Sequence, residues 1–292
     1  VQKADAVVNN LRGDQPAKLK IDYPNLKHIK KDLVCLHISA YGRDNSRTAW
    51  PGYDYLMQAE SGLMHLTGDP NGDPARSGAS MIDYMTGVTG MLGLLAAVNK
   101  AKKTGKGCDV DVSLFDVALH QLSYAGTWYM NKGLESGRLP RGSHLSVTPV
   151  QTFPSSDGWI YVMCMSDKFW LAMLDAIEAP ELAHDDRFKT QKLRAENRDE
   201  LTAVLDAVFK QKTTDHWLSV LRGVLPIAPV LTVKQAFENP FLDEIDMVRS
   251  VPHAKDPNMK LLGNPIKFDG QRLSQQPCRP LVTEAKSTGG AQ

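Results

Sequence analysis

Residues 51–83 read PGYDYLMQAESGLMHLTGDPNGDPARSGASMID and end at the start of an apolar, glycine-spaced helix predicted over residues 81–103. Asp83 therefore lies in the first turn of that helix. A carboxylate at a strand-to-helix junction can be the exposed nucleophile of an α/β enzyme. It can equally be an ordinary helix cap, paired with Ser80 in a capping-box-like S-x-x-D pattern. The residues alone leave both interpretations open.

Apolar strands alternate with helices on both sides of this stretch, which favours a mostly parallel sheet covered on both faces. The run LVCLHIS (33–39) is continuously apolar, as is typical of a strand buried on two sides. Three glycines on one face of the 81–103 helix, Gly87, Gly90 and Gly93, predict close helix packing. The other elements predicted in this part are strands Ala6–Asn9 and Asp109–Val112, helices Tyr23–Lys31, Tyr53–Thr67 and Ser113–Met130, and a loop at Gly68–Gly78.

The pattern changes near residue 140, where a strand pair is followed by helices, as in a separate α+β domain. We therefore predict a large α/β domain at 1–145, a small α+β domain at 146–240, and a segment at 241–292 that returns to the large domain and ends in a disordered tail. The predicted elements are strands Val150–Phe153, Trp159–Met163, Met247–Val251 and Ile266–Phe268, and helices Lys168–Ile177, Asn197–Phe209, Thr214–Leu221 and Val233–Phe237.

Composition excludes several classes of partner. The 34 lysines and arginines nearly balance 33 aspartates and glutamates, so no overall field attracts nucleic acid or an anionic membrane. No apolar run is predicted to reach membrane-spanning length. The four cysteines are far apart in the sequence, which favours a reducing compartment and hence a cytoplasmic protein. Neither they nor the histidines have the spacing of metal ligands, so no metal site is predicted.

Several motifs, in order, resemble those of the class III CoA-transferases, the family of formyl-CoA transferase and the carnitine CoA-transferase. The resemblance extends over nearly the whole chain. The motifs are ADAVVNNLRG (4–13), KIDYPNLKHI (20–29), LVCLHISAYG (33–42), PGYDYLMQAESGLMHLTG (51–68), SMIDYMTG (80–87), KTGKGCDVDVSLFDVAL (103–119), SVTPVQTFPSSDGWIYV (146–162) and PIAPVLTV (226–233).

The resemblance implies a fold and an assembly. It implies a Rossmann-like large domain with a mostly parallel sheet, a smaller α+β domain, and a homodimer whose two chains interlock like linked rings. Family members carry a further stretch before ADAVVNN, with the first strand and part of the CoA nucleotide site, and they end in a further helix. The sequence is therefore expected to be a fragment or a truncated product with an incomplete large domain.

The resemblance also assigns site residues. Asp83 occupies the position of the family's nucleophile, which forms an aspartyl anhydride and then an aspartyl-CoA thioester. Backbone N–H groups at the start of its helix are expected to stabilise the carboxylate and the oxyanions. Tyr53 stands where the racemase branch has a histidine base; a phenol is a poor base at neutral pH, so Tyr53 favours transfer. Its other interpretation is a packed aromatic side chain.

The remaining predicted binding residues are polar. By resemblance, Asn10 matches an asparagine near the pantetheine, Lys18 an arginine near the nucleotide phosphates, and Asp54 an acidic position, and Arg12 is close enough to help. For Asn10, Arg12 and Lys18 the alternative is a solvated surface residue, and for Asp54 it is solvation at a helix start.

The predicted function is transfer of CoA from an acyl-CoA donor to a carboxylic acid, with CoA as substrate and no metal or other cofactor. A small dicarboxylate such as succinate is the predicted acid, because many family members use one, and Arg43, Arg47 and Arg76 lie in loops that could hold its second carboxylate. They could equally be solvated. The alternatives are a racemase acting on 2-methylacyl-CoA and an inactive, truncated paralogue that binds CoA.

Overall fold

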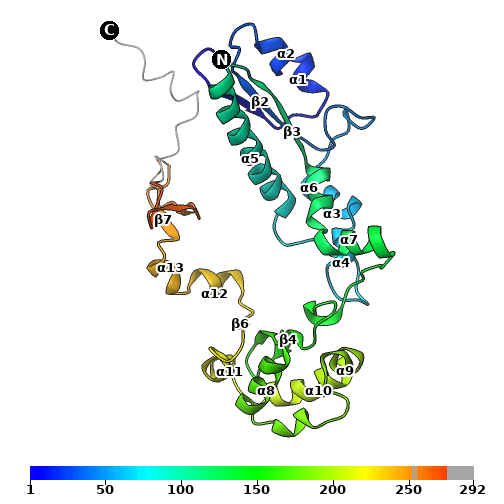
Figure 1. Cartoon of the computed structure of the whole chain (residues 1–292). Helices are drawn as coiled ribbons and strands as arrows, with labels where there is room; N and C mark the ends of the chain where they lie inside the picture. The colour runs from blue at the N-terminus through cyan, green and yellow to red at the C-terminus, as the bar shows by residue number, and fades with distance from the viewer. Residues whose placement is uncertain (252, 254, 275–292) are drawn as a thin grey trace. The chain divides into compact units, whose positions relative to one another are not determined.

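The computed structural model describes residues 1–251, 253 and 255–274, and the chain divides into two units, Val1–Ala228 and Pro229–Gln292 (Figure 1). The first unit contains two sheets, each with its own hydrophobic core. The predicted domain boundaries near residues 145 and 240 stay predictions.

The first sheet is parallel, as predicted. Its strands are β1 (Ala6–Asn9), β2 (Val34–Ser39) and β3 (Cys108–Ser113), in the order β1-β2-β3. β2 lies between the other two and is almost wholly buried, which explains its continuous apolar run. Because all three strands are parallel, their carboxyl ends lie at one edge of the sheet.

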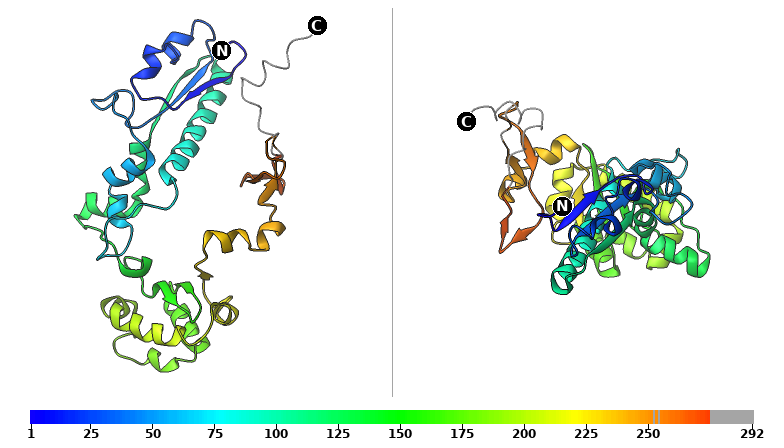
Figure 2. Two further views of the ribbon diagram at one scale, coloured as in Figure 1. Left: turned by 180° about the vertical axis from the view of Figure 1, so that it is seen from behind. Right: turned by 90° about the horizontal axis from the view of Figure 1, so that it is seen from above.

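Helix α5 (Met81–Thr104) covers one face of this sheet (Figures 1 and 2). Two of its glycines permit the close approach. A Cβ on Gly90 would lie 3.3 Å from Leu36 Cδ2, and one on Gly93 would lie 3.0 Å from Val110 Cγ1. The close packing predicted for these positions is confirmed. The helix ends at Gly105, which has φ +67°, a left-handed cap with two lysines in the last turn.

The prediction that no stretch reaches membrane-spanning length was wrong by length and composition. Among the described residues, α5 is one helix long and apolar enough to cross a bilayer, and only 22% of its most apolar window is buried. Its contacts with β2 and β3 account for one side of the helix. The opposite side remains apolar and exposed.

The other face of the sheet is covered by two short helices, α1 (Gln15–Lys18) and α2 (Tyr23–Leu26). The predicted helix over Tyr23–Lys31 is wrong beyond Leu26. The carbonyl of Lys31 accepts hydrogen bonds from the Tyr23 hydroxyl at 2.9 Å and from the Gly107 amide at 2.8 Å, because the chain has already turned toward β2.

Two other predicted helices are each broken into a pair. Gly62, with φ +93°, separates α3 (Asp54–Glu60) from α4 (Leu63–Leu66). Ser123, with φ +49°, marks the break between α6 (Leu114–Gln121) and α7 (Ser123–Lys132). A left-handed residue cannot continue a right-handed helix, so each helix changes direction there.

The second sheet has the order β4-β5-β6. The antiparallel pair β4 (Val150–Pro154) and β5 (Trp159–Met163) was predicted, and β6 (Ile227–Pro229) was not. Its core is formed by large buried side chains such as Phe153, Trp170 and Phe209. The helices that follow the strand pair are α8 (Asp167–Ala176), α9 (Gln191–Glu196), α10 (Arg198–Phe209) and α11 (Thr214–Leu221). A 3₁₀ turn at Pro140–Gly142 precedes the pair, and another at Pro180–Ala183 lies between α8 and α9.

A fully buried arginine holds this second core together. The Arg194 guanidinium donates to the carbonyl oxygens of Thr148 at 3.1 Å and Phe188 at 3.0 Å. It also donates to Gln191 Oε1 at 3.0 Å and forms an ion pair with Asp167. These partners offset the cost of burying the Arg194 charge. In return, Arg194 supplies the hydrogen-bond donor for the carbonyl groups of Thr148 and Phe188.

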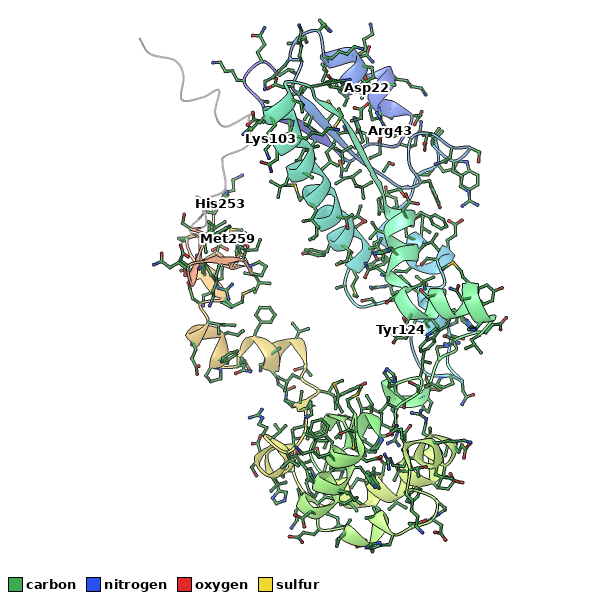
Figure 3. The ribbon with its side chains drawn as sticks, in the orientation of Figure 1. Asp22, Arg43, Lys103, Tyr124, His253 and Met259 are labelled. Atoms are coloured by element: carbon green, nitrogen blue, oxygen red, sulfur yellow. The ribbon has the colours of Figure 1, made fainter. Side chains whose placement is uncertain are left out.

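The second unit contains helices α12 (Val233–Phe237) and α13 (Phe241–Glu244), the antiparallel pair β7 (Val248–Ser250) and β8 (Lys260–Leu262), and the short pair β9 (Lys267–Phe268) and β10 (Gln271–Arg272). The predicted helix and both predicted strands are present within a few residues of their expected bounds. Cys278 and the predicted tail lie outside the described residues, and His253 and Met259 belong to the β7–β8 connection (Figure 3).

Candidate active site

A pocket of about 520 Å³ brings together four of the six predicted site residues, namely Asn10, Arg12, Tyr53 and Asp83. It opens at the carboxyl edge of the parallel sheet. Asn10 and Arg12 follow β1, the end of β2 contributes Ser39, and Leu114 follows β3. Ligands in open parallel sheets bind at this edge, because the loops leaving adjacent strands converge there.

Asp83 is exposed to solvent at the mouth of this pocket, on the first turn of α5. Partial desolvation of its carboxyl raises its pKa, and the negative charge of Asp54 raises it further. A carboxylate in this position is more basic than an ordinary surface aspartate. It is reachable by a substrate, which a nucleophile requires.

Asp54 is the group that fixes the start of α5. Its side chain is buried, with 3% of the residue exposed, and Oδ2 accepts hydrogen bonds from the amides of Ile82 at 2.6 Å and Asp83 at 3.0 Å. Its Oδ1 accepts from Gln58 Nε2 at 2.5 Å, and Gln58 Oε1 in turn accepts from the Ser77 amide at 2.9 Å. Its predicted contact with the substrate stays a prediction.

The capping interpretation of Ser80 and Asp83 was wrong. Ser80 is the N-cap residue, but its side chain makes no capping hydrogen bond. The cap comes instead from Asp54, on a different helix. A tertiary contact therefore does what the local S-x-x-D pattern was expected to do, and it leaves the Asp83 carboxyl outside the cap.

The expectation that first-turn amides of α5 stabilise oxyanions was also wrong. The amides of Ile82 and Asp83 donate to Asp54. The amide of Met81 donates to the Ala79 carbonyl at 2.9 Å, and that of Tyr84 to the Ser80 carbonyl at 3.2 Å. An oxyanion must find its donors elsewhere in the pocket.

Lys18 does not line the pocket. Its ammonium lies 2.6 Å from Asp14, which Arg12 also contacts, with Nε at 2.6 Å. The hydrogen bond from Arg12 and then that from Lys18 lower the pKa of Asp14 well below its usual range. Both predicted phosphate-binding cations therefore share one carboxylate, with which a phosphate would have to compete.

The aromatic wall of the pocket consists of Tyr53, 75% exposed, and Trp50. Arg47 stacks on Trp50 with Cζ 4.8 Å from the ring centre and forms an ion pair with Glu60.

The three arginines that could hold the second carboxylate of a dicarboxylic acid each interact with another side chain. Arg43 pairs with Asp109 and Asp111 (Figure 3 labels Arg43), Arg47 pairs as described, and Arg76 stacks on Tyr55. None of the three lines the pocket of Asp83.

Sequence reasoning missed Trp50, Thr86 and Gly87 as pocket residues. For the last two a signal was present, because positions three and four residues after Asp83 lie on the same face of a helix. Gly87 was predicted to pack, yet a Cβ there would meet no atom within 4 Å. It leaves room in the pocket wall beside the carboxylate.

Comparisons with known proteins agree on one family. The model of "CoA-transferase family III" matches residues 1–285. The chain is 32% identical over 271 residues to an acyl-CoA transferase of Fusarium pseudograminearum, covering 92% of this chain and 59% of that protein. It is 32% identical over 272 residues to the acetyl-CoA:oxalate CoA-transferase of Acetobacter aceti, covering 92% and 68%.

Further relatives extend the match. The succinyl-CoA:glutarate CoA-transferase of Homo sapiens is 28% identical over 279 residues, covering 95% of this chain and 64% of that protein. The chain thus spans 59% to 68% of the length of these three relatives. A solved CAIB/BAIF family protein from Brucella suis has a TM-score of 0.84 at 28% identity, covering 98% of this chain and 74% of that one.

Proposed function

Because the chain belongs to CoA-transferase family III, we propose that it moves CoA from an acyl-CoA to a carboxylic acid. The relatives that support this are named for transfer between two acyl groups, such as acetyl-CoA and oxalate or succinyl-CoA and glutarate. The observation that carries the proposal is an exposed, unusually basic carboxylate, Asp83, beside a pocket at the carboxyl edge of the sheet.

The proposed chemistry uses Asp83 as nucleophile. Its carboxylate attacks the donor thioester carbon, giving an aspartyl anhydride and releasing CoA thiolate. The thiolate then attacks the aspartyl carbonyl, which forms an aspartyl-CoA thioester and releases the donor acid. The acceptor carboxylate repeats the two steps in reverse: it displaces the thiolate to form a new anhydride, and the thiolate takes the acceptor acyl group and frees Asp83.

Trapping the intermediate tests this function. The protein is incubated with acetyl-CoA or succinyl-CoA, and Asp83 is examined by peptide mass spectrometry and by cleavage with hydroxylamine. A CoA adduct on Asp83 is expected, together with CoA exchange into added oxalate or succinate. Exchange of deuterium at C2 of a 2-methylacyl-CoA without an adduct identifies a racemase. A folded protein that gives neither signal is an inactive paralogue.

The role of Asp54 gives a pH prediction. Transfer requires ionised Asp83, so kcat is expected to fall as the pH drops through the pKa of Asp83, which lies above that of an ordinary aspartate. Asp54→Asn keeps an oxygen for the two α5 amides but removes the charge that raises the pKa of Asp83. The acid limb of the kcat profile is therefore expected to move to lower pH.

Asp54→Ala is the matched comparison, because it also removes the hydrogen bonds to Ile82 and Asp83. We expect it to lower kcat by about 10- to 100-fold, since loss of a hydrogen bond to a charged group costs about 1.5–3 kcal/mol. An unchanged kcat in the alanine variant, or an acid limb that stays in place in the asparagine variant, contradicts the role of Asp54.

The exposed side of α5 supports the further proposal of a homodimer. Tyr84, Val88, Leu92 and Leu95 form an apolar stripe on this side, each more than half exposed. Helical spacing of three to four residues places them in one row. A monomer seldom leaves such a patch in water, and a second copy of the chain is the proposed partner. Cytoplasmic location stays a prediction.

Leu92→Glu tests the dimer by placing a charge in the middle of the stripe. The variant is expected to elute as a monomer in size-exclusion chromatography with light scattering, whereas wild type elutes as a dimer. Lys103→Glu, near the end of the same helix and outside the stripe, is the control and is expected to leave the mass unchanged. A monomeric wild type contradicts the proposal.

A further inference from the structure

A buried histidine connects the interior of the first sheet to the pocket. His37 lies on β2, and its side chain is fully excluded from solvent. Its Nδ1 lies 2.8 Å from Asn9 Nδ2, at the end of β1. Its Nε2 lies 2.9 Å from Asp109 Oδ1 on β3. The three side chains form a row across the sheet, on the face opposite α5.

The partners of the ring fix its protonation. An amide nitrogen only donates, so Asn9 Nδ2 donates to His37 Nδ1, and that ring nitrogen carries no proton. A carboxylate only accepts, so the proton is on Nε2 and is donated to Asp109. His37 is therefore neutral in this arrangement. A protonated ring would carry a hydrogen on Nδ1 and could no longer accept from Asn9.

Asp109 is a fixed anchor at one end of the row. It also accepts from the Tyr23 amide at 2.8 Å and from Arg43 Nη2 at 2.9 Å. Burial acts to raise the pKa of Asp109, but the hydrogen bonds from His37, Tyr23 and Arg43 outweigh it and lower the pKa to about 2. The carboxylate stays ionised throughout the working pH range, so any change in the row arises at the histidine.

The other end of the row reaches the pocket. Asn9 Oδ1 accepts a hydrogen bond from the Leu11 amide at 3.4 Å. Leu11 lies between Asn10 and Arg12, which both line the pocket of Asp83. One amide side chain thus contacts the buried imidazole with its nitrogen and the turn after β1 with its oxygen. If the amide rotates to face a protonated ring with its oxygen, the contact with Leu11 is lost.

We propose that His37 is a positioning residue for CoA-ester binding, and that its neutral form sets the turn carrying Asn10 and Arg12 through Asn9. This inference rests on the proposed function of the Asp83 pocket. It predicts that the affinity for the acyl-CoA falls when His37 takes up a proton. The chemistry at Asp83 is not expected to depend on this proton.

Several charged or titratable groups surround His37. They are Asp109 and Asp111 on β3 and Arg43, which pairs with both carboxylates. Cys35, two residues earlier on the same face of β2, stays a neutral thiol, because burial raises its pKa to about 12. The pH at which the affinity for the acyl-CoA falls is therefore expected to equal the pH at which the His37 ring is observed to take up its proton.

The test measures KM for succinyl-CoA and kcat from about pH 8 to about pH 5, the range in which histidines titrate, in wild type and three variants. Wild-type KM is expected to rise as the pH falls, in step with protonation of His37 followed by its ¹⁵N NMR signals. At high pH, those signals should show a neutral ring with its proton on Nε2.

The variants separate positioning from general structural support. Asn9→Ala should raise KM about 10-fold at high pH, the effect of about 1.4 kcal/mol, with kcat changed less than about 3-fold, and should remove the pH dependence of KM. His37→Gln offers an oxygen to Asn9 and an amide to Asp109, so it should keep a low KM that no longer rises in acid. His28→Gln, at an exposed histidine, should behave as wild type.

A wild-type KM that is flat while the NMR signals report protonation of His37 overturns the inference, as does a neutral ring with its proton on Nδ1. Should wild type bind succinyl-CoA without turnover, the Kd from calorimetry replaces KM and the same comparisons apply. The proposed function fails separately, by absence of both transfer and the Asp83 adduct. If wild type binds no CoA ester at all, both proposals are rejected.

Discussion

Replacing Asp83 by alanine is expected to lower the rate of CoA transfer by at least about a thousandfold, because loss of a covalent nucleophile removes the reaction path itself. The measurement is the steady-state rate of CoA exchange between succinyl-CoA and an added acid, together with the mass of the Asp83 peptide. Activity near that of wild type would rule out the proposed chemistry.

The fold is expected to survive this substitution. The start of α5 is held by Asp54, whose bonds are to the backbone amides of Ile82 and Asp83 and not to the Asp83 side chain. Removing the second carboxylate also relieves the repulsion between the two charges. Circular dichroism should therefore match that of wild type, and the midpoint of thermal unfolding should be equal to that of wild type or slightly higher.

Ser80→Ala is the matched control on the same turn. Loss of a functioning N-cap side chain costs about 1 kcal/mol of unfolding free energy. The Ser80 side chain makes no capping bond, so the free energy of unfolding is expected to change by less than about 0.5 kcal/mol. A loss near the full capping value would restore the local capping interpretation that the structure contradicts.

Arg194→Met is expected to give the largest loss of stability, about 3–5 kcal/mol in the free energy of unfolding of the second sheet and its helices. Methionine fills part of the volume, but the carbonyl oxygens of Thr148 and Phe188 lose their donor inside the core. Urea unfolding, followed by tryptophan fluorescence, measures the change, since Arg194 Cζ lies 5.0 Å from the Trp170 ring centre.

Arg187→Met provides the comparison on the same segment. Arg187 is half exposed and pairs with Asp185 at the surface, where solvent screens the attraction. Its replacement should leave the urea midpoint almost unchanged. If both substitutions lower the urea midpoint by the same amount, the buried hydrogen bonds of Arg194 do not stabilise the core as described.

The elements that the sequence predicted well are those with a strong local signal. β2 is an unbroken apolar run, and α5 has apolar residues at helical spacing with Gly105 at its end. The helix breaks at Gly62 and Ser123 were not predicted. Glycine inside an apolar helical pattern is often tolerated, so Gly62 does not by itself predict a break. Nothing in the sequence around Ser123 indicates the positive φ that this residue has in the structure.

The pocket could be predicted in part. Asn10, Arg12, Tyr53 and Asp83 meet because each lies where a chain leaves a strand or enters a helix, which motif positions can locate. The contact of Asp54 with the start of α5 joins residues 28 positions apart and depends on how two helices pack. Neither propensity nor periodicity records such a pairing, so the S-x-x-D pattern at Ser80 is the capping signal that the local sequence offers.

The hydrogen bonds that join Asp54, Gln58 and Ser77 have an implication for engineering. Asp54 on α3 holds the backbone amide of Asp83, while residues 68–76 form a glycine- and proline-rich loop that contacts α3 through Arg76, which stacks on Tyr55, and through the Ser77 amide. We therefore expect exchange of residues 69–75 for the loop of a relative to leave the Asp83 carboxylate in place, because Arg76 and Ser77 keep their contacts with α3.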